Sequence, residues 1–395
     1  MQGKYLIRDS IGATIGVFLV MALFAYIPFN FKILDPLKHG LKDFEFSDIY
    51  FTKIKKEAPI DSNIIIVNVG YNNRFGLLQQ LQRIKQAGPA VIGFDIQLLK
   101  NKDPFIDSLL TAEINNTPNM VMASYLSGKG HENYRSEVVT TALPLTNPTW
   151  GYINFIGKDS TYPVRYFKPF YEFTKTPQEA FATAIVKKYN PAAYEALKGR
   201  GKPLETINYS RRQDQYHIID AFELEDTALD INVMKDKIVL MGFLGPDLKT
   251  KVIEENRFTP MNPKFSGKAF PDMYGVIIHA NIISSILEGK YINKVPSWLS
   301  MVLAFIICWI HVFFFTKFYI RQHKFFHLVT KIIQLLTFVL MVYLSFFFLS
   351  KFGLKIDMSP ILAGIALSVD VLYFYDGFAT WLKEKYGYHT VFGHH

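Results

Sequence analysis

Residues 297–319 read SWLSMVLAFIICWIHVFFFTKFY and contain no Asp, Glu, Lys or Arg before Lys317. Two more apolar runs follow closely, at residues 332–350 and 360–378. About 20 consecutive apolar residues can cross a bilayer as a helix, because a helix satisfies its own backbone hydrogen bonds where water is absent. The alternative is a buried helical hairpin in a soluble core, where three such runs in tandem are rare. The sequence therefore predicts three membrane spans within residues 296–379.

A fourth apolar run, IGATIGVFLVMALFAYIPF, occupies residues 11–29. A cleaved signal peptide is the alternative, but the run is about 18 residues long and no small-x-small cleavage site follows it. We therefore expect residues 1–29 to be an uncleaved transmembrane anchor. Gly12 and Gly16 leave one face of this helix smooth, which favours close packing against the C-terminal spans.

The distribution of basic residues predicts the orientation of the spans, because lysine and arginine are enriched on the cytoplasmic side of a membrane. Three segments that flank the spans are basic: the N-terminus, the loop between the second and third spans, and the tail at residues 380–395. Their basic residues are Lys4, Arg8, Lys317, Arg321, Lys324, Lys331, Lys383 and Lys385. Both termini are thus expected in the cytoplasm and residues 30–295 in the periplasm, in a multi-pass protein of the cell inner membrane. Lys351 and Lys355, on the outer side in this scheme, argue mildly against it.

Composition narrows the class of protein further. Half of the 395 residues are apolar, 15% are aromatic, and the formal net charge is +9. The basic residues flank the spans and form no basic–aromatic patch, so we expect no nucleic-acid partner. Cys308 is the sole cysteine, which excludes an intrachain disulfide and a cysteine-based zinc site. No cofactor or metal motif is present in the sequence.

The periplasmic segment has the pattern of an α/β domain. Residues 64–69 (IIIVNV) and 90–96 (AVIGFDI) read as strands buried on both faces. Between them, an apolar stripe of helical period ends at Gly88-Pro89, so the three elements form a βαβ unit with parallel strands. Further strands are expected at 119–125 and 237–242, further helices at 104–114, 177–189 and 274–287, an antiparallel pair at 150–156 and 162–170, and a long loop at 243–270. The fold class is an α/β extracytoplasmic domain with a largely parallel central sheet, plus an α-helical membrane domain of four spans.

Four pieces of this domain resemble a known family. They are IIIVNVGYNNR (64–74), AVIGFDI (90–96), KIVLMGFLGPD (237–247) and GVIIHANIISSILEGKYI (275–292). Together with the three tandem spans, they resemble the CHASE2 domain, an extracytoplasmic sensor module of bacterial membrane proteins. The resemblance implies that the domain binds a ligand or partner.

The chain departs from the family pattern in two places. Many members carry an acid at the end of the first strand and a WPW-like turn after it, where this chain has Asn68 and residues 71–74 (YNNR). Members commonly end in a cytoplasmic output domain, whereas residues 380–395 are too few for an independent core. We therefore expect a sensory or accessory subunit of a larger envelope complex, which needs another integral membrane or envelope protein as its partner.

Two acids are candidate ligand-binding residues. Asp95 and Asp247 each follow a buried strand, and open α/β sheets bind ligands at the carboxyl ends of their strands. If the strands are neighbours, the two carboxylates can line one crevice and hold a divalent cation or a polar ligand. The alternative is that each aspartate only pins its own loop. An extracytoplasmic enzyme using Asp95 and Asp247 is the alternative function, but no catalytic motif supports it.

The remaining candidates lie on helices. His279 and Asn281 precede the membrane, and a histidine there can titrate near neutral pH or can simply be packed in the core. Asp370 lies inside the fourth span, where an acid is costly without a partner. His311, Lys317 or a helix of another protein can supply that partner. Alternatively, Asp370 lies at the level of the lipid headgroups and is hydrated.

Overall fold

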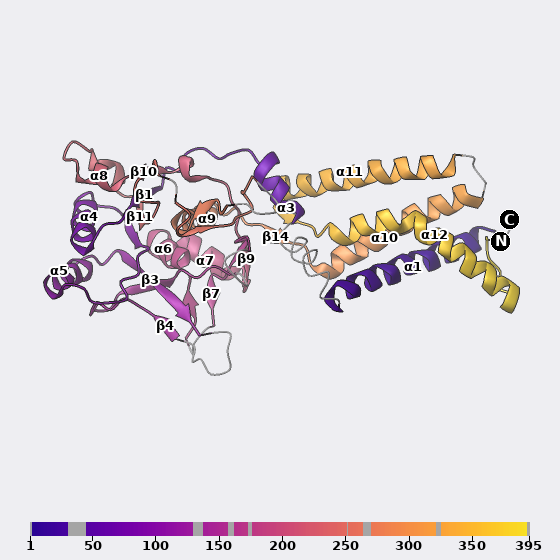
Figure 1. The fold of residues 1–395 in the computed structure, drawn as a ribbon, viewed down its shortest axis with the longest axis horizontal. Coiled ribbons are helices and arrows are strands. Elements are labelled where there is room, and N and C mark those ends of the chain that lie inside the picture. Colours follow the sequence, from indigo (N-terminus) through magenta and orange to yellow (C-terminus); the bar gives the residue numbers. More distant parts are fainter. Residues whose placement is uncertain are drawn as a thin grey trace. The chain divides into compact units, whose positions relative to one another are not determined.

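The computed structural model describes residues 2–30, 45–128, 137–156, 162–172, 176–250, 252–263, 270–320 and 325–392. The chain divides into two compact units. Ser47–Ile292 forms an α/β unit, which we call the sheet unit, and Met1–Phe46 with Asn293–His395 forms the helical unit. Figure 1 shows the sheet of the first unit between helices and the long helices of the second.

The sheet unit is built on a largely parallel sheet, as the sequence predicts. Its strands follow the order β10-β1-β11-β2-β3, and β3 is flanked by both β4 and β5. Within the described strands of this sheet, the β3–β4 pairing alone is antiparallel. The strands are β1 (Ile64–Asn68), β2 (Val91–Phe94), β3 (Met120–Ser127), β4 (Glu137–Val139), β5 (Thr149–Tyr152), β10 (His217–Ile219) and β11 (Ile238–Gly242). Every residue of β1, β2 and β11 is buried, which explains their unbroken apolar sequences.

Helices cover both faces of this sheet. On one face, α4 (Arg74–Gln86) packs beside α5 (Pro104–Asn115) over the odd-numbered residues of β1. On the other face, α6 (Phe181–Tyr189) packs beside α9 (Gly275–Leu287). The helix α4 connects β1 to β2, but β11 lies between these two strands. The two strands of the predicted βαβ unit are therefore parallel but not adjacent, because β11, from much later in the chain, lies between them.

The predicted antiparallel pair at 150–156 and 162–170 is wrong. The strand β5 pairs in parallel with β3, whereas β6 (Tyr166–Phe167) pairs with β9 (Glu205–Thr206). The reason is the close approach of α6 at Gly151, where a Cβ atom would lie 2.5 Å from the Cα of Phe181. A glycine allows the helix backbone to cover this strand, so β5 extends the main sheet.

The helical unit contains the four helices that the sequence predicts as spans, each long and apolar enough to cross a membrane. They are α1 (Gln2–Asn30), α10 (Ser297–Ile320), α11 (Phe326–Phe352) and α12 (Ser359–Tyr386). Helices α1, α10 and α12 pack against one another. The smooth face of α1 meets α12 as expected, since a Cβ at Gly12 would lie 2.4 Å from the Tyr375 hydroxyl. The predicted basic residues Arg321 and Lys324 lie outside the described residues.

The segment after α12 folds back onto α1. The buried carboxylate of Asp9 accepts hydrogen bonds from Thr390 Oγ1 at 2.7 Å and from the backbone amide of Val391 at 2.9 Å. The predicted tail at 380–395 therefore begins inside a helix and continues as a segment bonded to α1.

Candidate functional site

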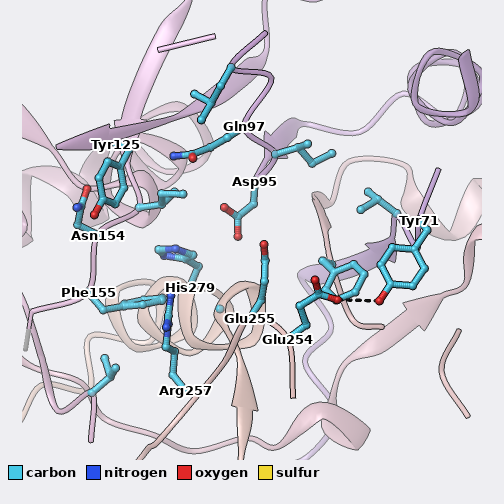
Figure 2. A pocket seen from close by; sticks show the side chains of 18 of the residues that line it. Tyr71, Asp95, Gln97, Tyr125, Asn154, Phe155, Glu254, Glu255, Arg257 and His279 are labelled. Atoms are coloured by element: carbon cyan, nitrogen blue, oxygen red, sulfur yellow. Dashed lines mark hydrogen bonds between the residues drawn. The ribbon is translucent and has the colours of Figure 1, made fainter. Parts of the chain in front are cut away.

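A cavity of about 760 Å³ lies at the carboxyl ends of the parallel strands in the sheet unit (Figure 2). Residues that follow β1, β2, β5 and β11 contribute to its wall, and α9 contributes Gly275 and His279. A volume of this size lies within the range of small-molecule sites, and this edge of a parallel sheet is where such sites form. The cavity is therefore the candidate ligand site.

Asp95 is the predicted acid that lines this cavity. It directly follows β2, and its backbone amide donates to the Met241 carbonyl of β11 at 2.9 Å. Burial raises the pKa of its carboxyl group to about 7, and the nearby Glu255 adds to the rise. Among the described residues, no hydrogen bond or basic side chain acts in the opposite direction. The ionised form of Asp95 thus has no compensating partner in the described part of the protein.

Glu255 faces Asp95 from the loop before β12 (Asn256–Arg257), and the two carboxyl groups point toward one another (Figure 2). The backbone of Glu255 has φ 58°, a left-handed conformation that is costly for a residue with a side chain. Burial raises the pKa of its carboxyl group, and Arg257 partly offsets that rise. A strained residue that points a carboxylate into a cavity indicates a functional position.

His279 lines the same cavity with a buried ring. Its ring stacks on Phe155 with centroids 4.8 Å apart and meets the edge of Phe181 at 5.3 Å. The residue is 4% exposed, and its Nδ1 atom has no hydrogen-bond partner among the residues that the structure describes. Burial lowers the pKa of His279 to about 3, so the ring stays neutral between pH 5 and 8. Burial thus disfavours the titration near neutral pH that the sequence allowed for this histidine.

The mouth of the cavity is aromatic and acidic. The Tyr71 hydroxyl donates to Glu254 Oε2 at 2.7 Å, and its ring lies 5.3 Å from that of Phe243. Tyr71 is 66% exposed and Tyr125 is 44% exposed, so both rings remain accessible. Figure 2 shows them on opposite sides of the Asp95 carboxyl group.

Asp247 and Asn281 are not among the residues that line the cavity, although β11 is next to β2 as the crevice prediction required. The carboxylate of Asp247 accepts from the backbone amides of Lys249 and Thr250 at 2.8 and 2.7 Å, and these bonds lower its pKa. Asn281 is fully buried, and its side-chain oxygen accepts from two backbone amides, of Ser210 at 3.0 Å and of Arg211 at 3.1 Å. Each thus stabilises a neighbouring loop.

The intramembrane candidates do not meet. Asp370 lies 3.5 Å from Lys331 Nζ of α11, and His311 Nδ1 lies 2.9 Å from the carbonyl of Ile307 one turn earlier in its own helix. The expected partners His311 and Lys317 are thus replaced by a lysine of the adjacent helix. The side chains of Asp370 and Lys331 are 58% and 53% exposed, so the ion pair lies on the outside of the helical unit.

Asn68, where the family resemblance implies an acid, has a structural position. Its amide nitrogen donates to Asp220 Oδ1 at 2.8 Å and to the Gly245 carbonyl at 3.2 Å, while its oxygen accepts from Leu244 N at 2.9 Å. An aspartate could not make the two donations. Asn68 therefore fixes the loop after β11.

Comparison with known protein families matches residues 73–315 to the CHASE2 domain. The chain belongs to the CHASE2 domain family. The match begins after β1, so the first of the four resembling pieces lies almost entirely before it. CHASE2 domains are extracytoplasmic sensor domains, which agrees with a ligand cavity in this unit. No curated protein and no solved structure matches the chain.

Sequence reasoning did not identify Glu254, Glu255 and Arg257 as residues of this CHASE2 cavity. All three lie within residues 243–270, a segment without periodicity that the sequence predicts to be a long loop. The pairing of β12 with β13 (Met273–Tyr274) brings that loop beside the start of α9 and hence beside His279. The sequence shows only two consecutive glutamates in a loop at this point. Acidic residues are too common in loops for this pattern to predict a ligand site.

Proposed function

We propose that this CHASE2 domain binds a small polar ligand in the cavity at the carboxyl ends of its strands. The observation that carries the proposal is that two polar groups of the lining, the partly exposed Asp95 carboxyl and the buried His279 Nδ1, have no hydrogen-bond partner among the described residues. Structural acids of the same unit are satisfied: Asp107 binds Arg74, and Asp220 binds Asn68. A buried polar group without a protein partner is costly, so a ligand is the natural partner. Binding is favoured over catalysis because Asp247 lies outside the cavity lining.

A ligand screen on the full-length protein in mild detergent tests this function. Gln97→Trp places a large ring at an exposed position of the cavity wall, and Gln82→Trp makes the same change at an exposed position of α4 outside it. We expect small polar compounds that raise the melting temperature of the parent and of Gln82→Trp by several degrees to leave Gln97→Trp unchanged. Failure to find such a compound, or equal stabilisation of all three proteins, would contradict the proposal.

We further propose that the sheet unit lies in the periplasm and that both termini lie in the cytoplasm. The basic residues at both ends of the chain support this orientation. The single buried cysteine allows a direct test in a Cys308→Ala background. A membrane-impermeant maleimide is expected to label exposed Lys198→Cys in intact spheroplasts, and exposed Lys385→Cys only after permeabilisation. The reverse pattern would place the sheet unit in the cytoplasm.

The Asp370–Lys331 pair supports a role as a sensory or accessory subunit of a larger complex. Both side chains face outward from helices that are apolar enough to span a membrane. Charges in contact with lipid are costly, so we propose that a polar transmembrane helix of a partner protein covers them.

Removing both charges tests this partner site. The double variant Asp370→Leu/Lys331→Leu is expected to run as a smaller species than the parent on native gels after mild extraction. Met301→Leu, an exposed position of α10, serves as the control and is expected to keep the parent's size. An unchanged complex in the double variant would show that the ion pair is merely hydrated near the headgroups.

A further inference from the structure

We infer that the cavity takes an organic ammonium ion, held between the carboxylates of Asp95 and Glu255 and against the neutral ring of His279. This inference rests on the proposed function, because it names the class of ligand for the same cavity. Three independent features of the cavity support it: its excess of acid, its unpaired acceptor and its aromatic mouth.

The lining of the cavity carries more acid than base. Asp95, Glu254 and Glu255 contribute three carboxyl groups, and Arg257 contributes the one guanidinium among the lining residues. The pKa values of Asp95 and Glu255 are raised, and Arg257 offsets only part of the rise at Glu255. A cationic ligand supplies the missing opposite charge, whereas an anionic ligand meets like charge at Asp95 and Glu255.

His279 supplies an acceptor that is independent of the acids. Its Nδ1 is buried and unpaired, and the ring is neutral, so in the tautomer protonated at Nε2 the Nδ1 lone pair accepts a hydrogen bond. An ammonium group has three N–H donors and no acceptor. Two carboxylates and one imidazole nitrogen match those three donors in number and in kind.

The mouth of the cavity suits a cation with an organic body. The faces of tyrosine and phenylalanine attract cations, and Tyr71, Tyr125, Phe155 and Phe243 all line the cavity. A bare metal ion fits less well, since calcium takes six to eight oxygen ligands. Within the described part of the chain, no cluster of three or more His, Cys, Asp or Glu side chains is placed to hold a metal.

Three compounds with the same five-carbon chain separate the ligand classes: 1,5-diaminopentane, 1,5-pentanediol and glutarate. We expect the diamine, added at millimolar concentration to the full-length protein at pH 8, to raise the melting temperature of the parent. The diol and the diacid should leave it unchanged. Asp95→Asn is expected to abolish the response, whereas Asp247→Asn, the same change at an acid outside the cavity, should keep it.

The pH dependence of diamine binding tests the role of the carboxylate directly. A proton and the ligand compete for Asp95, whose pKa is about 7, while the amine stays protonated. The affinity should therefore fall about tenfold between pH 8 and pH 6. Apart from the tyrosines, the other titratable or charged groups that line the cavity are Glu254, Glu255, Arg257 and His279. Burial lowers the pKa of His279 to about 3, so its ring stays neutral in this window.

Several results would overturn the inference. Equal or greater stabilisation by the diol or by glutarate would do so, as would a diamine response that Asp95→Asn retains or that pH does not change. Stabilisation by calcium without any by the diamine would assign the cavity to a metal. If a neutral or anionic compound binds to the parent but not to Gln97→Trp, the inference of an ammonium ligand is wrong, whereas the proposed ligand-binding function is supported.

Discussion

Arg74→Met is expected to lower the free energy of unfolding of the sheet unit by about 3–5 kcal/mol. Arg74 opens α4, and its guanidinium donates to Asp107 Oδ1 of α5 at 2.7 Å. The two side chains are only 7% and 8% exposed. Methionine fills a similar volume but leaves the Asp107 carboxylate buried without its counter-charge, and that uncompensated charge is the main cost.

The same pair joins two walls of the ligand cavity. Arg74 also donates to the Lys100 carbonyl, and Asp107 Oδ2 accepts from the Lys102 amide at 2.8 Å. Arg74 comes directly after the loop that carries Tyr71, and both lysines lie in the loop that begins at Asp95. Loss of Arg74 is thus expected to loosen both loops as well as the contact between α4 and α5.

Thermal unfolding of the full-length protein in detergent measures this effect, with an expected fall in melting temperature of about 10 °C. The double variant Arg74→Met/Asp107→Leu should recover most of the loss, because no charge remains buried. A single variant within about 1 kcal/mol of the parent would show that water already reaches the Asp107 carboxylate.

The strands at the centre of the sheet could be predicted because their burial is complete. Unbroken β-branched runs such as residues 64–67 indicate a strand covered on both faces, and β1, β2 and β11 are such strands. The order of the strands could not be predicted. The insertion of β11 between β1 and β2 depends on contacts between residues more than 140 positions apart, as in the register Ile65↔Val239↔Ile92.

Local contacts also explain the elements that sequence reasoning misplaced. The helix predicted at 177–189 begins at Phe181, because Gln178–Glu179 (β8) pairs with Phe170–Tyr171 (β7) instead. The third and fourth spans are longer than the apolar runs: α11 begins at Phe326 and α12 continues to Tyr386. A helix can extend past its apolar run into polar residues where capping and packing stabilise the added turns. Hydropathy alone does not predict these polar ends.

The rule that ligands bind at the carboxyl ends of parallel strands located the right edge of the sheet. It singled out Asp95, which lies in the cavity, and equally Asp247, whose carboxylate turns back onto its own loop. The rule says where a strand ends but not which way the next side chain points. That direction depends on hydrogen bonds such as the one from Thr250 to Asp247, which sequence spacing does not reveal.

Asp95→Asn is expected to stabilise the protein at pH 8 and to have little effect at pH 4. In the unfolded chain the aspartate ionises at its ordinary pKa of 3.8, whereas burial raises the pKa to about 7 in the folded protein. Between these values the folded state holds a proton that the unfolded state has lost. The free energy of unfolding therefore falls as pH rises through this window, and the loss is complete above about pH 7.

Asparagine carries no charge at any pH and so removes this loss. A pKa shift from 3.8 to about 7 corresponds to about 4 kcal/mol at pH 8, and partial hydration of the cavity reduces it, so a gain of about 2–4 kcal/mol is expected. Two other buried groups change charge in the same range, Asp272 with a pKa of about 6 and Lys55 with a pKa of about 7. The measured quantity is therefore the difference between the unfolding free energies of parent and variant at each pH.

This difference should grow from near zero at pH 4 to its full size by about pH 7.5 and then stay constant. Asp247→Asn provides the opposite case, because backbone hydrogen bonds lower the pKa of Asp247 and its ionised form stabilises the fold above that pKa. If the difference between the unfolding free energies of Asp95→Asn and the parent does not change with pH, the Asp95 carboxylate is already stabilised by water or a protein group in the folded state. If removing the charge of Asp95 stabilises the empty protein, its carboxylate is a binding group that folding leaves without a partner. The same ionised carboxylate that weakens the empty protein at pH 8 is then available to a cationic ligand.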